Sequence, residues 1–135
     1  MGTEDFTLEC WARLNGMGDS NASAFFTTAT TSLGNSPYLY WGFKSGVLAV
    51  ANNSFTTVAS FDATPYFNKW THYAICRNGS TIRMFANGQL MSSGTASTDF
   101  TMSNQAKIGQ RYNNQDAYSL QGQMSDYRIY RGVGK

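Results

Sequence analysis

Hydrophobic and polar residues alternate along most of this chain, which is the period-two pattern of half-buried β-strands. The clearest run is DFTLECWARL at residues 5–14, which predicts a strand with one buried face. Its two faces are Phe6, Leu8, Cys10 and Ala12 on one side and Thr7, Glu9, Trp11 and Arg13 on the other. Further runs predict strands over 24–30, 36–43, 46–52, 55–61, 106–112 and 120–130.

The segment KWTHYAICRNGSTIRMFANGQL, residues 69–90, predicts three consecutive antiparallel strands. Its Asn78-Gly79 and Asn87-Gly88 pairs favour two-residue hairpin turns, because both central residues of such a turn need positive φ. Tight closure places Ile75 opposite Ile82, Tyr73 opposite Met84, and Met84 opposite Met91. The expected core face is Tyr73, Ile75, Ile82, Met84 and Met91, and the expected outer face is His72, Ala74, Cys76, Arg83, Phe85 and Leu90.

Turn-forming residues separate the runs. Residues 15–23 and 113–118 are rich in Gly, Asn and Ser or other polar residues, and Pro65 indicates a connection or a strand edge. No helical periodicity of useful length is present. Many short strands with turns between them predict one all-β domain over 1–135, an antiparallel sandwich.

Composition narrows the classes of function. The formal charge is +2 and the basic residues are scattered, which argues against nucleic acid as a partner. No apolar run is long enough to span a bilayer, and residues 1–10 lack the layout of a signal peptide. The chain has one histidine, which argues against a Cys/His zinc site with its full number of ligands. Cys10 and Cys76 are expected to be small buried hydrophobes, while a disulfide between them stays open.

Four segments, in order, resemble the laminin-G-like branch of the concanavalin A-like lectin/glucanase superfamily. They are GTEDFTLECW (2–11), the W-x-H-x-A segment with its hairpins (69–90), KIGQRY (107–112) and LQGQMSDYRIYRGV (120–133). The resemblance implies a jelly-roll sandwich of two antiparallel sheets, used for recognition or assembly. It is nearest to versions found in phage tail and other virion proteins.

That resemblance implies a structural or decoration component on a virion surface, or an extracellular module. Its partners would be other virion proteins, copies of itself, or host glycans. The alternative is a free-standing lectin or adhesion module. Family members usually have a further strand before this first segment and more chain after the last, so two interpretations stay open: a piece of a longer protein, or a sheet edge completed by a neighbouring chain.

Catalysis is the least favoured function. Retaining glucanases place two carboxylates about 5–5.5 Å apart, from alternate positions of one strand. No two acidic residues here are spaced i, i+2; they are Glu4, Asp5, Glu9, Asp19, Asp62, Asp99, Asp116 and Asp126. His72 lies in an expected strand, which favours a structural role. We therefore expect a protein that is not an enzyme.

Ligand binding is expected in the loop QRYNNQDAY, residues 110–118, because it combines aromatic rings, amides and a carboxylate. The candidate residues are Arg111, Tyr112, Asn113, Asn114, Gln115, Asp116 and Tyr118. Some laminin-G-like domains bind calcium through aspartates and backbone carbonyls. The resemblance therefore makes Asp19 and Asp116, which lie in expected loops, candidate calcium ligands, with Asn21 or Asn114 helping. No other cofactor is expected.

Three tryptophans, Trp11, Trp41 and Trp70, could stack on sugars, but packing in the core or on a sheet face is the favoured interpretation. Asp126 stands two residues before Arg128, and an ion pair between them is expected.

Overall fold

The computed structural model describes residues 2–18, 23–28, 39–52, 55–97, 99–100, 106–110 and 119–135. These residues form strands and one short 3-10 helix, η3 (Thr64–Tyr66). The strands are β1 (Phe6–Leu14), β2 (Ala24–Thr27), β3 (Tyr40–Lys44), β4 (Val47–Ala51), β5 (Thr57–Phe61), β6 (Trp70–Asn78), β7 (Thr81–Ala86), β8 (Gln89–Thr95), β9 (Lys107–Ile108) and β10 (Gly122–Arg131).

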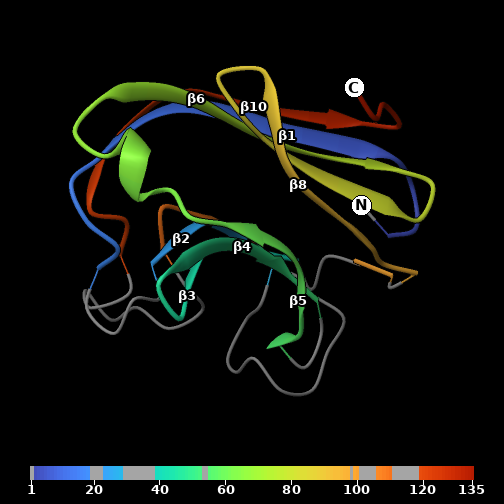
Figure 1. The fold of residues 1–135 in the computed structure, drawn as a ribbon. Helices are drawn as coiled ribbons and strands as arrows, with labels where there is room; N and C mark the ends of the chain where they lie inside the picture. The colour runs from blue at the N-terminus through green and yellow to red at the C-terminus, as the bar shows by residue number, and fades with distance from the viewer. Residues whose placement is uncertain are drawn as a thin grey trace.

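The strands form two five-stranded sheets that stack as two curved layers (Figure 1). Sheet I has the order β10-β1-β6-β7-β8, and sheet II has the order β5-β4-β3-β2-β9. Their neighbouring strands pair antiparallel. The expected jelly-roll sandwich of the concanavalin A-like type is thus confirmed. Strand β1 lies between β10 and β6, so the two ends of the described chain meet in one sheet.

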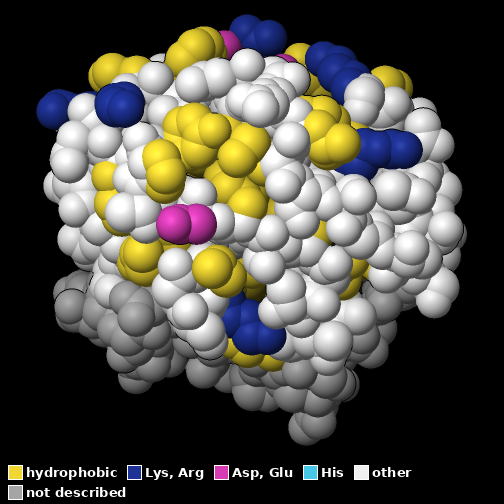
Figure 2. Space-filling view, in the orientation of Figure 1, with side chains coloured by type: hydrophobic (Ala, Val, Ile, Leu, Met, Phe, Trp, Pro, Cys, Tyr) yellow, Lys and Arg dark blue, Asp and Glu magenta, His cyan; other side chains and the backbone are white. Residues whose placement is uncertain are grey.

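The core fills the space between the sheets. The predicted inward face of β1 is fully buried there, together with Tyr73, Ile75, Ile82 and Met84 from β6 and β7. Met91 is partly buried against the same cluster. This burial confirms the inward faces that were assigned from alternation, since side chains alternate between the two faces of a strand. On the surface, Figure 2 shows hydrophobic side chains at the side of the sandwich and most basic side chains of this view over the upper sheet.

The predicted hairpin registers are wrong. In the first hairpin Ile75 pairs with Met84 and Tyr73 with Ala86, because β6 continues through Asn78 and the turn is Gly79-Ser80. Only Gly79 of the Asn-Gly pair has positive φ, and its N–H donates to the Asp5 carboxylate at 2.7 Å. The two-residue displacement leaves every side chain on its expected face.

The second hairpin closes at Asn87-Gly88 as predicted, with positive φ at both residues. A β-bulge then follows, because the register shifts by one residue between Met84 and Phe85. Met84 consequently lies opposite Ser92 rather than Met91. Bulges of this kind insert one unpaired residue, and alternation in the sequence does not mark them.

Other boundaries are shorter than predicted. Within the described residues, β2 ends at Thr27, and β9 covers Lys107–Ile108 of the strand expected over 106–112, whose residues 111–112 are not described. Around Pro65 the chain forms η3, and the Asp62 carboxylate accepts hydrogen bonds from the Thr64 hydroxyl at 2.6 Å and the Thr64 N–H at 2.9 Å. These bonds lower the pKa of Asp62, the hydroxyl contributing most. The connection expected at Pro65 is confirmed.

The two cysteines are free and lie on opposite faces of sheet I. Cys10 faces the core and pairs with Tyr73, whereas Cys76 pairs with Thr7 on the outer side. This placement excludes the disulfide that the sequence left open. Both thiols are buried, as expected, although Cys76 is covered from outside.

The last described residues cover Thr7, the partner of Cys76 across β1 and β6. Thr7 donates a hydrogen bond to the Val133 carbonyl at 2.9 Å, and its hydroxyl accepts one from the Lys135 N–H at 3.1 Å. The chain after β10 thus crosses the outer face of sheet I beside Thr7. This crossing explains why an outward-facing threonine is only 2% exposed.

Candidate functional site

Outward-facing side chains of β1 and its two neighbouring strands form a continuous row on the outer face of sheet I, here called the β1 face. Along β1 the outward residues are Arg13, Trp11, Glu9 and Thr7, a span of about 20 Å at the usual rise per residue. Trp11 pairs with His72 of β6 and Ser125 of β10, and Arg13 pairs with Trp70 and Gln123. Three hollows follow one another along this row.

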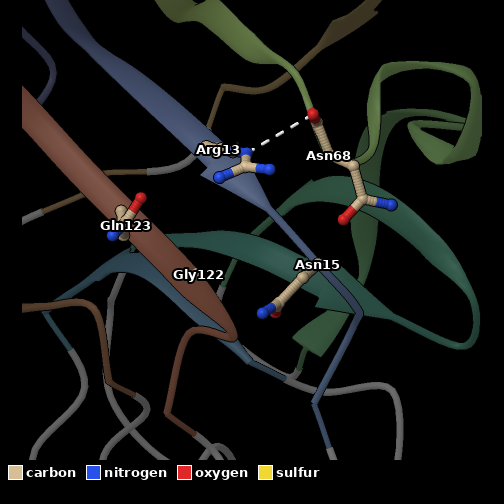
Figure 3. A pocket seen from close by; sticks show the side chains of 5 residues that line it. All are labelled: Arg13, Asn15, Asn68, Gly122 and Gln123. Atoms are coloured by element: carbon tan, nitrogen blue, oxygen red, sulfur yellow. Dashed lines mark hydrogen bonds between the residues drawn. The ribbon is translucent and has the colours of Figure 1, made fainter.

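The first is the amide hollow, of about 380 Å³. Figure 3 shows its side chains, with the Arg13 guanidinium between Gln123 on β10 and Asn68 across the hollow. Its lining residues are Arg13, Asn15, Asn68, Gly122 and Gln123.

The backbone around the amide hollow is fixed by hydrogen bonds. The Asn68 N–H donates to the Leu14 carbonyl at 2.7 Å, and the Asn15 N–H donates to the Gln121 carbonyl at 3.0 Å. Arg13 Nε donates to the Asn68 carbonyl at 3.4 Å, which leaves other guanidinium N–H groups to face the hollow. Three amides and one guanidinium can therefore donate to and accept from a polyhydroxyl ligand.

The second is the indole hollow, of about 240 Å³, lined by Trp11, Trp70 and Ser125. Trp11 is 42% exposed and Trp70 is 48% exposed, so each offers a large apolar surface to solvent. The ring of Trp11 packs beside the His72 imidazole, with a distance of 5.4 Å between ring centroids. Trp41, by contrast, is fully buried in the core, where it stacks on Phe25.

The third is the apolar hollow, of about 170 Å³. Its lining is Thr7, Glu9, His72, Ala74, Cys76, Phe85, Gly88 and Lys135. Among the residues that line the three hollows, Glu9 is the one carboxylate.

Cations surround the Glu9 carboxylate. Its Oε1 lies 3.9 Å from Arg128, 4.0 Å from Lys135 and 3.3 Å from the Tyr130 hydroxyl, which donates to it. Its Oε2 lies 3.8 Å from His72 Nε2. Glu9 therefore sits in a mixed network of charges rather than beside a second carboxylate.

Arg128 belongs to a second ion pair, with Asp126, as the sequence predicted. Its guanidinium donates to both carboxylate oxygens, at 2.9 and 2.7 Å. This bidentate contact raises the pKa of Arg128. The interpretation of Asp126 as an ion-pair partner is confirmed.

The predicted binding loop falls outside the described residues, and so do both predicted calcium ligands. This applies to Arg111, Tyr112, Asn113, Asn114, Gln115, Asp116, Tyr118 and Asp19. The structure does place the two ends of that loop together, because Gln110 and Ser119 form an antiparallel bridge. The Asn15 N–H bonds the residue two after Ser119, so the loop begins and ends near the amide hollow.

Within the described ranges no group of three or more His, Cys, Asp and Glu side chains could hold a metal ion. Across those same ranges, no helix combines the length and the apolar character that crossing a bilayer requires.

Sequence reasoning did not identify the amide hollow. Arg13, Asn15, Asn68 and Gln123 come from separate parts of the chain and carry no common motif. The exposed indole of Trp11 could be predicted, because Trp11 alternates with the apolar residues of its strand and so falls among the outward-facing polar positions.

The family model of the concanavalin A-like lectin/glucanases superfamily, Laminin_G_3, matches residues 1–133. No curated protein sequence matches the chain with significance.

Solved structures share the fold at low identity. A Bacteroides ovatus protein named for carbohydrate binding matches with TM-score 0.71 and 17% identity, over 100% of this chain and 39% of that one. Domain 4 of AbnA, a GH43 extracellular arabinanase from Geobacillus stearothermophilus, in complex with arabinotriose, matches with TM-score 0.70 and 17% identity, over 100% of this chain and 64% of that one. Mouse laminin α1 domains LG4-5 match with TM-score 0.71 and 13% identity, over 96% of this chain and 36% of that one. This chain thus spans less than two thirds of the length of each of these chains. Because the family model matches nearly its whole length, the chain belongs to the laminin-G-like part of the concanavalin A-like lectin/glucanase superfamily.

Proposed function

We propose that this domain is a carbohydrate-binding module without catalytic activity and that the β1 face holds the glycan. One observation carries the proposal: two half-exposed indoles lie directly beside a hollow lined by a guanidinium and three amides. Two of the similar structures agree with this class, one named for carbohydrate binding and one bound to arabinotriose.

The chemistry of the β1 face suits sugars. The C–H faces of a sugar ring stack on an indole, and removing both apolar surfaces from water supplies the binding energy. Hydroxyl groups at the ring edge then pair with amide and guanidinium groups, so that no buried polar group is left unpaired. Trp11 and Arg13 are successive outward residues of β1, which brings the two kinds of contact within one ligand's reach.

The arrangement around Glu9 favours binding over hydrolysis. Most glycoside hydrolases use a pair of carboxylates, one as acid and one as base or nucleophile. The hollows of the β1 face offer one carboxylate, and cations surround it. A hydrolase is accordingly the weaker alternative.

The setting of the domain follows from the resemblance described above. We propose an extracellular place of action, with a virion surface as the specific case and other virion proteins or copies of the chain as neighbours. The loop of residues 111–118, including Tyr112 and Asp116, remains a second proposed contact for the glycan, with calcium at Asp19 and Asp116 as an open prediction. An assembly role predicts self-association of the purified chain, which analytical ultracentrifugation measures directly.

A glycan array followed by isothermal titration calorimetry tests the proposal. Trp70→Ala should weaken binding of the best glycan about tenfold or more, because a stacking surface is lost. Ile108→Ala is the matched control: Ile108 is 53% exposed but lies on β9 of sheet II, so its loss should leave affinity unchanged. Folded protein that binds no glycan, or equal affinity for both variants, would contradict the β1 face as the site.

A further inference from the structure

The apolar hollow continues the proposed glycan site along β1. Trp11 and Glu9 are successive outward residues, about 7 Å apart along the strand, and His72 both packs on Trp11 and lines the hollow. A sugar chain stacked on Trp11 therefore reaches the hollow with its next unit. What the hollow can accept then decides which glycans fit.

The walls of the hollow are apolar. Ala74 and Phe85 pair across β6 and β7, and Cys76 is the next outward residue of β6. A sugar hydroxyl placed against these side chains would lose its hydrogen bonds to water without replacement, which is unfavourable. A methyl group would gain by burial. An unmodified hexose is thus a poor occupant.

Polar atoms stand at the rim of the same hollow. Glu9 Oε1 takes the hydrogen bond from Tyr130, whereas Oε2 has only His72 Nε2 near it, at 3.8 Å, which is too long for a hydrogen bond. Within the described part of the chain, Oε2 therefore keeps an open acceptor site. The Glu9 side chain is 14% exposed, so a ligand can still reach it.

A cation stands behind Glu9, on the side of β10. Lys135 Nζ lies 3.7 Å from the centre of the Tyr130 ring and 4.0 Å from Glu9 Oε1. The ammonium group therefore neighbours Oε1, whereas Oε2 is the oxygen nearer His72 and the hollow. The hollow thus offers one open acceptor at the edge of an apolar floor.

An acetamido group combines an N–H donor with a methyl group, which matches the open acceptor and the apolar floor. We propose that the apolar hollow binds the acetamido group of a 2-acetamido-2-deoxy sugar, with its N–H toward Glu9 Oε2, its methyl against Ala74 and Phe85, and its carbonyl toward solvent. This inference rests on the proposed function, because the neighbouring sugar must stack on Trp11. It assigns the ligand to the N-acetylated glycans.

Calorimetry with two matched trisaccharides tests the inference. Triacetylchitotriose and cellotriose share the β-1,4 backbone and differ by acetamido against hydroxyl at C2. The wild-type chain should bind the acetylated sugar about tenfold more tightly or better, which corresponds to about 1.4 kcal/mol. Chitosan trimer, with free amines, should bind no more tightly than cellotriose.

Two variants locate the preference. Ala74→Leu fills the hollow and should reduce the ratio of the two affinities to about one, chiefly by weakening the binding of triacetylchitotriose. Glu9→Gln keeps the shape of the side chain and removes the charge of the acceptor, so the ratio should fall several-fold. This second variant also covers the case in which the leucine disturbs the sheet. Thermal unfolding confirms that each variant is folded.

The outcomes separate this inference from the proposed function. Equal affinity of the wild type for both trisaccharides, or a preference that both variants retain, overturns the acetamido site. A preference for sugars that carry a methyl but no amide, such as 6-deoxyhexoses, overturns it too. In either case, glycan binding that Trp70→Ala weakens about tenfold or more leaves the proposed function standing, whereas no glycan binding at all removes both.

Discussion

The indole of Trp11 lies against the imidazole of His72, with 5.4 Å between ring centroids and planes inclined by 59°. The two residues are direct partners across β1 and β6. An exposed tryptophan on a sheet would otherwise have several rotamers available, and ordering them on binding costs free energy. The histidine ring therefore keeps the indole in place before the ligand arrives.

We predict that His72→Ala weakens glycan binding about two- to tenfold, since an aromatic pair contributes about 0.5–1.5 kcal/mol beyond its buried area. Calorimetry should use a glycan without acetamido groups, so that the apolar hollow has no part in the result. Trp70→Ala provides the comparison, because it removes a stacking surface rather than its support. Unchanged affinity in His72→Ala would show that Trp11 is ordered without its neighbour.

Arg77 is a buried cation at the end of β6, and its side chain is predicted to stabilise the fold. It is 3% exposed, and its guanidinium donates to the carbonyls of Gly79 at 2.8 Å and Gly2 at 3.1 Å. The same group lies 5.3 Å from the centre of the Phe100 ring. Arg77→Met keeps much of the bulk and removes the charged donor to these part-buried carbonyls, so the free energy of unfolding should fall by about 1.5–3 kcal/mol.

Urea denaturation measures the effect of Arg77→Met. Arg131→Met is a suitable control, because its ion pair with Glu4 is exposed and such pairs contribute at most about 1 kcal/mol. Similar losses in the two variants would contradict the role assigned to Arg77.

The contrast between the two hairpins of residues 69–90 shows how far sequence reaches into this fold. Alternation fixed which side chains face the core, because a displacement of two residues moves none of them to the other face. The register depended on a tertiary contact, since the carboxylate of Asp5, more than 70 residues away along the chain, bonds the Gly79 N–H and holds the turn one residue later. No local pattern contains that contact.

The candidate site was less accessible to sequence reasoning than the fold. Loop composition directed attention to residues 110–118, of which the structure describes only Gln110. The β1 face instead brings Arg13 and Gln123 together through strand pairing, and Asn68 joins them through its N–H bond to the Leu14 carbonyl. Side chains that are distant along the chain become neighbours only once the order β10-β1-β6 is known. A site spread over three strands leaves no motif.

The stability of the domain should fall at alkaline pH because of Cys10. Burial, with a smaller contribution from the charge of Glu9, raises the pKa of this thiol from 9.0 to about 12. Above pH 9 the unfolded chain loses the thiol proton while the folded chain keeps it, so the folded state binds more protons and stability decreases as pH rises towards 12. The slope from one such group is about 1.4 kcal/mol per pH unit.

Urea denaturation of wild type and Cys10→Ala at pH 8, 9 and 10 isolates that contribution. The difference in unfolding free energy between the two proteins should narrow as pH rises, because the variant lacks the titrating thiol. In native buffer, Cys10 should also resist Ellman's reagent and react after denaturation. A constant difference across the pH series would show that the thiol titrates alike in both states.

Close contact between the two sheets at one edge predicts that Gly94 cannot be replaced. A β-carbon on Gly94 of β8 would lie 1.9 Å from the Val58 carbonyl oxygen of β5, and the Ser60 N–H donates to the Ser92 hydroxyl nearby at 3.3 Å. This contact joins β8, an edge strand of sheet I, to β5, an edge strand of sheet II, and closes that side of the sandwich. Gly94→Ala must separate two backbones, so we expect a loss of about 3 kcal/mol or more. Ser93→Ala, at the adjacent exposed position, should change the unfolding midpoint little, and equal midpoints for both variants would mean that the strands separate without cost.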